Sequence, residues 1–192
     1  MKKISKVIYL SILSLSLANA TPYSLDDSHT QVGFSVKHLM ITNVKGEFKT
    51  YNADIDFDAK TKKFKSFKAD VETKSVDTGI EKRDEHLRSE DFFLSEKFPK
   101  MTFVMKSYKA DGNKGKMSGD LTIKDVTKAV TLDVDDIATV KDFQGNNRVG
   151  FTLKGKINRM DYGLKWNKAL ETGGLAVSEE VKILVEIEAI EE

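Results

Sequence analysis

An alternation of apolar and polar residues with a period of two runs through the chain from Tyr23 almost to its end. Successive side chains of a β-strand point to opposite faces, so this pattern predicts half-buried antiparallel strands over most of the chain. Clusters of Gly, Asn and Asp, which supply turn conformations, separate the runs. The alternating apolar positions are Val32, Phe34, Val36; Val44, Gly46, Phe48; Ile55, Phe57; Phe67, Ala69, Val71; Met101, Phe103, Met105; Met117, Gly119, Leu121, Ile123; Val130, Leu132, Val134; Val149, Phe151, Leu153; and Val181, Ile183, Val185, Ile187.

One segment departs from this alternation. The residues 78–81, Thr-Gly-Ile-Glu, match a capping box, and a charged run over 81–91 follows them. We expect residues 78–94 to form a short helical cover, held on the strands by Leu87, Phe92 and Phe93, with its charged face in water. Pro99 precedes the next strand, where a missing N–H costs least.

The remaining chain, residues 21–192, shows no repeat or linker and is predicted to be one all-β domain. About eight or more one-sided strands favour a sandwich or a closed barrel, because every apolar face must be covered and every edge protected. Periodicity does not separate these two folds. A barrel of about eight strands encloses space for side chains or for one ligand, which makes the interior the default functional site.

Residues 1–20 carry the features of a signal peptide: a basic start, an apolar stretch over 7–17 and Ala-Asn-Ala before position 21. We therefore expect an exported, periplasmic protein that begins near Thr21. Removing the three lysines of this segment from 31 basic residues leaves 28 against 30 acidic ones, a net charge of −2. Such a balance, with charges scattered singly, does not indicate a nucleic-acid partner.

The side chains that could carry chemistry form no strong motif. His29, His38 and His86 lack the spacing of a zinc site, so no metal and no required cofactor are expected. Asp84 and His86 lie in a charged run that could act as general acid and base, but a solvated helix face is the simpler interpretation. No nucleophile motif or phosphate-binding loop accompanies them, so we predict a protein without catalytic residues.

Further along the chain, Arg159 and Asp161 share parity and are predicted to pair at a barrel end; alternatively, Arg159 faces a ligand head group. Trp166, the only tryptophan, follows in a polar loop that could cover an opening.

The ordered set of these segments resembles the YceI-like family over nearly all of residues 21–192. The matching segments are Tyr23 to His29, Val32 to Leu39, Gly46 to Phe48, Arg83 to Phe93, Phe98-Pro99 with Phe103, Gly119 to Thr127, and Asn158 to Leu164. The resemblance implies an antiparallel, lipocalin-like β-barrel of about eight strands, here with a short helical insertion. It also implies an exported protein that binds a long polyisoprenoid or another amphiphilic lipid in an internal tunnel.

Strand parity then gives the candidate ligand contacts. They are Phe34, Val36, Phe48, Phe57, Phe92, Phe93, Met101, Phe103, Met105, Leu121, Phe151, Leu153 and Trp166, with Arg83, His86 and Arg159 as polar candidates at the mouth. An apolar tube gains about 0.8 kcal/mol for each CH₂ it buries, so it selects length and width more than chemistry.

The expected function is therefore periplasmic carriage or storage of a long-chain lipid, with the bound isoprenoid or fatty chain as ligand. Three alternatives stay open: a fatty acid or fatty amide scavenger, an enzyme that uses Asp84 and His86 on the bound lipid, and a packed envelope protein without a cavity. A homodimer and a transient contact with a membrane or a membrane protein are compatible with the sequence, which decides neither.

Overall fold

The structure is a computed structural model that describes residues 20–171 and 173–192. The predicted signal peptide, apart from Ala20, lies outside the described residues, so it stays a prediction. Over the described ranges, no helix combines the length and the apolar character needed to cross a membrane.

The described residues contain eleven strands, a single α-helix and two 3-10 turns, at residues 73–75 and 159–162. The elements are β1 (Thr21–Leu25), β2 (Gln31–His38), β3 (Thr42–Phe48), β4 (Tyr51–Asp58), β5 (Lys63–Glu72), β6 (Val76–Asp77), α1 (Glu81–Arg88), β7 (Lys100–Asp111), β8 (Lys114–Ile123), β9 (Val126–Lys141), β10 (Asn147–Asn158) and β11 (Val177–Glu191).

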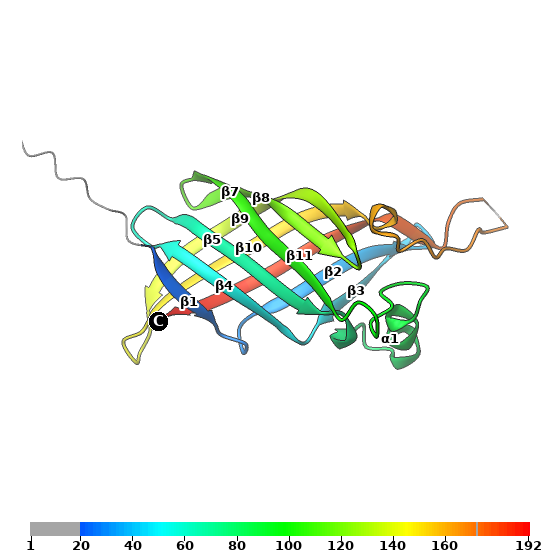
Figure 1. Ribbon diagram of the computed structural model, residues 1–192, viewed down its shortest axis with the longest axis horizontal. Helices are drawn as coiled ribbons and strands as arrows, with labels where there is room; N and C mark the ends of the chain where they lie inside the picture. The colour runs from blue at the N-terminus through cyan, green and yellow to red at the C-terminus, as the bar shows by residue number, and fades with distance from the viewer. Residues whose placement is uncertain (1–19, 172) are drawn as a thin grey trace, which may run out of the picture.

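Eight of the strands form a closed ring (Figure 1). Their order is β1, β4, β5, β7, β8, β9, β10 and β11, and β11 pairs back with β1. The closing contact joins the two ends of the domain, because Tyr23 lies opposite Glu191 on one side and Ile55 on the other. The fold is thus an antiparallel, lipocalin-like β-barrel with one short helix, as predicted, and the sandwich is excluded.

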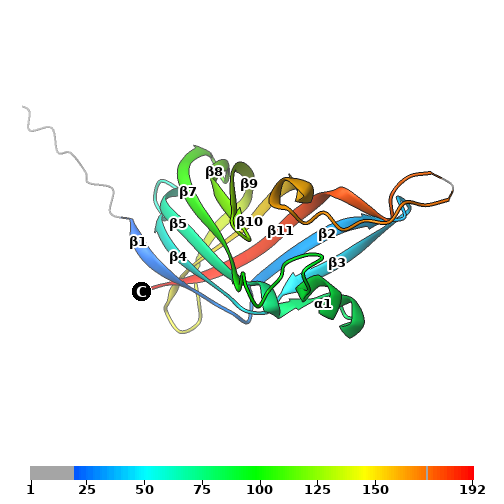
Figure 2. The same cartoon turned by 45° about the vertical axis from the view of Figure 1, so that its right-hand side comes forward.

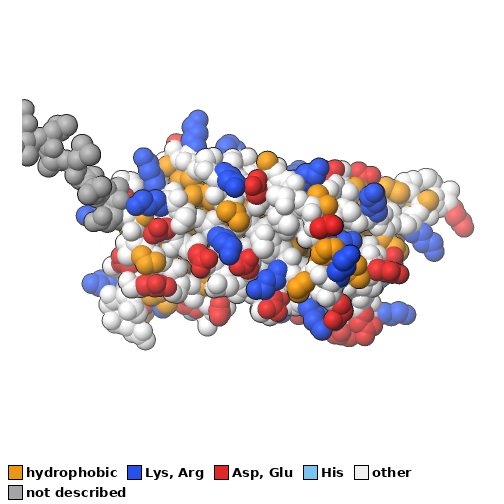
Figure 3. All heavy atoms as spheres, viewed as in Figure 1, with side chains coloured by type: hydrophobic (Ala, Val, Ile, Leu, Met, Phe, Trp, Pro, Cys, Tyr) orange, Lys and Arg blue, Asp and Glu red, His pale blue; other side chains and the backbone are white. Residues whose placement is uncertain are grey.

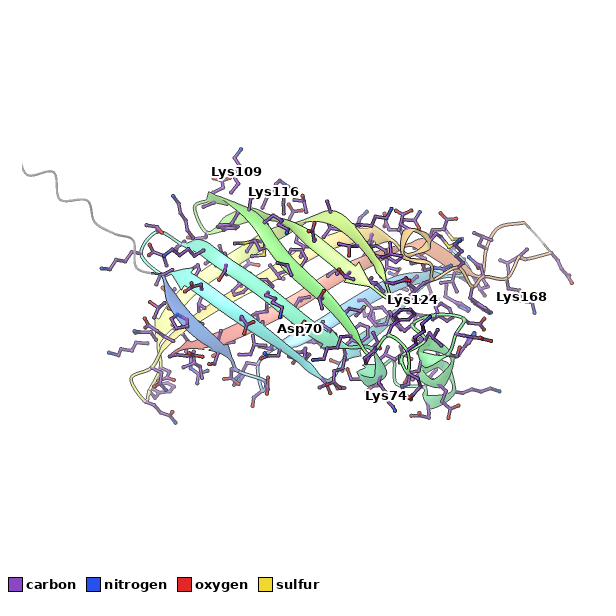
Figure 4. The ribbon with its side chains drawn as sticks, in the orientation of Figure 1. Asp70, Lys74, Lys109, Lys116, Lys124 and Lys168 are labelled. Carbon is purple, nitrogen blue, oxygen red and sulfur yellow. The ribbon has the colours of Figure 1, made fainter. Side chains whose placement is uncertain are left out.

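The alternation of the sequence separates the inside of the barrel from its outer surface. Lys109 and Lys116 project outward from β7 and β8 (Figure 4), whereas Met117, the neighbour of Lys116, is fully buried. Acidic and basic side chains are intermingled on the face shown in Figure 3. Each strand therefore presents one apolar face to the interior and one charged face to water.

The barrel wall divides at one end. Along one edge, β11 pairs with β2 from Val181 to Glu186, and then with β1 from Ala189 to Glu191. Residues 26–30 separate β1 from β2. Beyond the ring, the sheet continues from β11 through β2 and β3 to β6, which is its last strand. Figures 1 and 2 show α1 beside β3 at this end. We call this the open end, and the opposite end, with β1 and the 142–146 turn, the closed end.

Two apolar clusters fill these two ends. Phe57, Met117 and Val149 belong to the cluster toward the closed end and expose none of their surface. Aromatic rings interlock there, with the Phe64 and Phe151 centroids 4.8 Å apart. The cluster toward the open end consists of Phe48, Val76, Phe92, Phe93, Ile123, Tyr162 and Leu164.

The helical segment begins differently from the capping-box prediction. Ile80, in an extended conformation, is the N-cap of α1 and makes no capping hydrogen bond through its side chain. Gly79 has a φ of 77°, so a helix cannot start directly after Thr78. Thr78 instead donates its backbone N–H and its hydroxyl to Asp84 Oδ1, at 3.0 and 2.5 Å.

Candidate functional site

A cavity of about 410 Å³ lies inside the barrel and reaches the open end. Its wall is mainly apolar and draws on both clusters, from Phe67 and Leu132 in the first to Phe48 and Phe93 in the second. The barrel strands supply this wall because their inward parity carries β-branched and aromatic side chains. The sequence left open whether side chains or a ligand occupy the interior. In the structure, side chains fill the closed end, and the cavity lies between that core and the cover of the open end.

Ten of the thirteen predicted contact residues line this cavity. They are Phe34, Val36, Phe48, Phe92, Phe93, Met101, Phe103, Leu121, Leu153 and Trp166. The structure brings them together from five strands and from two connecting segments. Their role as ligand contacts stays a prediction.

The other three residues, Phe57, Met105 and Phe151, do not line the cavity. Phe57 and Phe151 are buried members of the cluster toward the closed end, and Met105 packs against that cluster. All three lie on the inward parity, as expected. Parity gives the face of a strand but not the depth along the barrel, and these residues lie where side chains fill the interior.

The segment after β6 covers the open end as predicted. Leu87, Phe92 and Phe93 line the cavity and pack in the cluster around Phe48 and Ile123. The rings of Phe48 and Phe93 meet edge to face, with centroids 5.7 Å apart. Aromatic and apolar contacts, rather than paired strands, therefore join the cover to the barrel.

Trp166 supplies a second part of the cover. Its ring centroid lies 5.6 Å from that of Phe92 and 4.9 Å from that of His86. The 3-10 turn at residues 159–162 and the segment after it carry Trp166 over the opening. The two covering segments meet through these three rings, although Phe92 and Trp166 are 74 residues apart in sequence (166 − 92).

The charged face of the cover is not wholly in water, which corrects the sequence prediction. Asp84 is only 3% exposed and accepts the two hydrogen bonds from Thr78. Arg83 donates from Nε to Thr78 Oγ1 at 2.7 Å and from Nη2 to Thr78 O at 2.8 Å. Arg83 and Asp84 thus hold Thr78 between them, and all but Asp84 line the cavity.

Asp84 and His86, the two groups of the catalytic alternative, form hydrogen bonds with different partners. His86 Nε2 lies 2.8 Å from Asp91 Oδ2, and Asp84 is bonded to Thr78. A general base must reach the proton that it abstracts from a bound substrate, whereas the Asp84 carboxylate is bonded to Thr78 and does not line the cavity. The geometry around Asp84 and His86 supports a structural role for the carboxylate.

Arg159 is a second buried charged group, at 4% exposure. It donates from Nε to Ser178 O at 2.9 Å and from Nη1 to Trp166 O at 2.9 Å, with further bonds to the carbonyls of Leu164 and Val177. Burial lowers the pKa of the guanidinium from its ordinary value. Arg159 therefore ties the Trp166 segment to the start of β11.

The predicted pair of Arg159 with Asp161 is wrong. Asp161 is exposed, and no ion pair between the two occurs in the described part of the chain. Shared parity presumes a strand, whereas residues 159–162 form a 3-10 turn, where positions two apart do not share a face. Arg159 lines the cavity, so its position at the mouth agrees with the second interpretation.

Sequence reasoning left out several wall residues. Val181, Ile183, Val185 and Ile187 of β11 lie on the inward parity that the sequence already displays. Tyr51 and Thr30 could not be found in this way, because they flank breaks between strands. Tyr51 donates its hydroxyl to Thr30 O at 2.6 Å, so this polar pair is satisfied within the wall.

One cluster of ligand-type side chains lies away from the cavity. The nearest ligand atoms of Asp26, His29 and Glu188 are within 4.8 Å of one another. Arg148 Nη1 donates to both carboxylates at 2.6 Å, and Arg148 Nε donates to Asp142 at 2.8 Å. The guanidinium already supplies the positive charge that these carboxylates require.

Fold and cavity together define a lipocalin-like barrel with an apolar interior that is covered at one end. The chain matches the YceI-like domain family over residues 23–189, and it belongs to that family. A UPF0312 protein of Staphylococcus epidermidis is 40% identical over 163 residues, which cover 84% of this chain and 93% of that protein.

Solved structures give the same assignment. The crystal structure of the Campylobacter jejuni YceI protein is 42% identical, covers 88% of this chain and 98% of its own, and superposes with a TM-score of 0.72. A polyisoprenoid binding domain from Saccharophagus degradans is 16% identical, with 90% of this chain and 99% of that one covered and a TM-score of 0.64. The second likeness supports the fold alone.

Proposed function

We propose that this protein binds one long-chain amphiphilic lipid, a polyisoprenoid in the first instance, inside the barrel and carries or stores it in the periplasm. The observation that carries the proposal is the apolar cavity of about 410 Å³ beneath a cover that no strand pairing locks. Ligand pockets commonly have volumes of about 300–1,000 Å³ and mainly apolar walls with a few polar groups.

The chemistry of the wall favours binding without covalent change. Each CH₂ group buried there contributes about 0.8 kcal/mol, so a chain of many carbons gains a high affinity from the wall alone. The polar side chains at the mouth, Thr78, Arg83 and Arg159, already share hydrogen bonds with one another or with backbone carbonyls. They can orient a head group, and none of them is set up as an activated nucleophile.

Two further observations support the proposal. The structural neighbour from Saccharophagus degradans is described as a polyisoprenoid binding domain. Residues 1–20 have the composition of an export signal, which underlies the periplasmic location. N-terminal sequencing of the protein from a periplasmic fraction tests this location, and an intact Met1 on cytoplasmic protein would contradict it.

Native mass spectrometry of the purified protein, followed by extraction and identification of the bound molecule, tests the function. We expect one long-chain lipid per chain. A fatty acid or a fatty amide in its place would support the scavenger alternative, whereas an empty protein that also fails to take up added prenol would contradict the proposal. Conversion of the bound lipid to a new product that requires His86 would favour the enzyme alternative.

A further inference from the structure

Three consecutive large apolar side chains are exposed at the turn between β2 and β3. Leu39, Met40 and Ile41 are 37%, 54% and 80% exposed. Leu39 and Met40 have φ values of 50° and 61°, in a region that residues other than glycine seldom adopt. A defined turn, closed by the hydrogen bond from Ile41 N to His38 O at 3.1 Å, therefore presents these side chains to the outside.

The neighbouring segment before β11 enlarges this surface. Leu39 N donates to Ala176 O at 2.8 Å, and Leu175 is 36% exposed beside it. Figures 1 and 2 both show the β2–β3 turn and the segment before β11 projecting together beyond the barrel at the open end. We call Leu39, Met40, Ile41 and Leu175 the apolar tip. It is a narrow convex projection, unlike the concave or flat surfaces on which folded proteins usually meet.

The apolar tip lies next to the opening of the cavity. Val36 and His38, just before the turn, and Ala176 and Val177, just after Leu175, all line the cavity. The same two segments thus form the wall on the inside and the tip on the outside. A molecule or surface that contacts the apolar tip therefore lies next to the opening of the cavity.

The two segments that carry the apolar tip hold more basic than acidic residues; Glu179 and Glu180 follow directly, and Glu180 pairs with Lys156. Residues 37–46 contain Lys37 and Lys45 and no acidic residue, and residues 163–178 contain Lys165 and Lys168 with Glu171 as the single acid. All four lysines are exposed. Figure 4 places Lys168 on the projecting segment, and Figure 3 shows hydrophobic and basic side chains there, with acidic ones nearby.

We propose that the apolar tip inserts into the interfacial region of an anionic lipid bilayer, so that the cavity opens toward the membrane. Apolar side chains at such an interface are buried at the boundary between head groups and acyl chains, while lysines beside them meet anionic head groups. This inference rests on the proposed function, in which the cavity takes up a lipid. With the mouth held at the bilayer, that lipid reaches the cavity without crossing water.

The experiment compares the wild-type protein with the double variant Met40→Ser/Ile41→Ser on vesicles of phosphatidylethanolamine and phosphatidylglycerol. Phe143→Ser is the matched control, because Phe143 is fully exposed in the turn at the closed end. Co-sedimentation measures partition onto the vesicles. Uptake of a fluorescent prenol is measured twice, once from the vesicles and once from a cyclodextrin solution.

We expect the double variant to lower vesicle partition and vesicle uptake by at least about tenfold, because two apolar side chains lose their burial. Uptake from cyclodextrin and the thermal midpoint should not change, and the control should behave as the wild type. Lys37→Gln and Lys168→Gln should each lower partition by about fivefold on anionic vesicles only, and high salt should remove this difference.

Equal partition of the wild type and the double variant would overturn the inference. So would a wild-type protein that binds no vesicles, or a tip that proves to be a contact between two copies in light scattering. Uptake from cyclodextrin separates this result from the proposed function: if the wild type takes up prenol from solution but ignores vesicles, only the docking fails. If it binds vesicles through the tip but takes up no prenol from either source, the proposed function fails.

Discussion

The closed and open ends of the barrel are both built from strands that alternate apolar and polar side chains, yet they differ in what the inward face contacts. Toward the closed end, inward side chains such as Phe57 and Val149 meet one another and leave no exposed surface. Toward the open end, the same face, here Phe34 and Val36, borders the cavity beneath the cover. Alternation decides which residues point inward, and the path of the strands decides whether the interior is filled.

The largest expected difference between the two ends concerns their phenylalanines. Phe57→Ala should lower the free energy of unfolding by about 3–5 kcal/mol, because it leaves a sealed void in packed core. Phe34→Ala only widens an existing cavity, so we expect a loss of about 1–2 kcal/mol together with weaker prenol binding. Urea unfolding and prenol titration of both variants measure these effects. Equal losses of stability with unchanged binding would remove the distinction between the ends.

The next effect concerns the cover of the open end. Asp84→Ala leaves the Thr78 N–H and hydroxyl without their acceptor, which should cost about 1–3 kcal/mol. Hydrogen exchange of residues 78–99 should accelerate, and bound prenol should leave faster. Glu85→Ala, the exposed neighbour on the same helix, is the control, and we expect it to stay within about 0.5 kcal/mol of the wild type. If the two variants behave alike, the buried carboxylate does not hold the cover.

The third prediction concerns the loss of stability at low pH, which we attribute to carboxylates at the closed end. Hydrogen bonds from Arg148 and then from His29 lower the pKa of the Asp26 carboxyl from 3.8 to about 2, and Arg148 also holds the pKa of Asp142 well below its usual range. A carboxyl whose pKa is lower in the folded state stabilises the fold above its unfolded pKa, and this contribution is lost as the pH falls toward the folded value. His29, whose pKa Asp26 raises, is already protonated in this range.

The thermal midpoint of the wild type should therefore fall as the pH decreases from about 4 to about 2. Arg148→Gln should flatten this part of the profile, because its carboxylates lose the guanidinium. Thermal melts across this range provide the measurement, with Lys116→Gln, whose partner Asp133 is more than half exposed, as the control. A profile of the Arg148 variant that is as steep as that of the wild type would assign acid sensitivity to other groups.

The smallest effects should be the same at both ends. Lys116 pairs with Asp133 and Lys156 pairs with Glu180, and all four side chains are more than half exposed. Exposed ion pairs contribute about 0–1 kcal/mol, so Lys116→Ala and Lys156→Ala should each cost less than about 1 kcal/mol. Urea unfolding of the two variants checks this expectation. A large loss at either position would mean that the outer surface also differs between the ends.

The sequence was sufficient for the strands and their inward faces, because parity is a local property of extended chain. It was not sufficient for closure, because the pairing of Tyr23 with Glu191 joins positions at opposite ends of the domain. The depth of a side chain along the barrel was equally inaccessible: Phe57 and Phe103 have the same local pattern, yet only Phe103 lines the cavity.

Two local patterns gave wrong details because the backbone leaves the conformation that each pattern assumes. The capping box requires helix directly after Thr78, but the positive φ of Gly79 delays the start. The pairing of Arg159 and Asp161 requires a strand, but a 3-10 turn follows β10. The buried acceptors of Arg159 are carbonyls of residues 164–178, and no pattern of side chains in the sequence displays them.

Phe67 belongs both to the packed aromatic cluster and to the wall of the cavity. Its ring lies 6.2 Å from that of Phe151, so under the proposed function a chain that enters at the open end stops against packed core. The barrel would then act as a molecular ruler whose end stop is also a structural residue. Substitutions in this aromatic cluster would then change two properties together: the chain length of the lipid that binds best and the thermal midpoint of the protein. The lengths of the lipids that Phe67→Ala retains, compared with those of the wild type, would reveal that coupling.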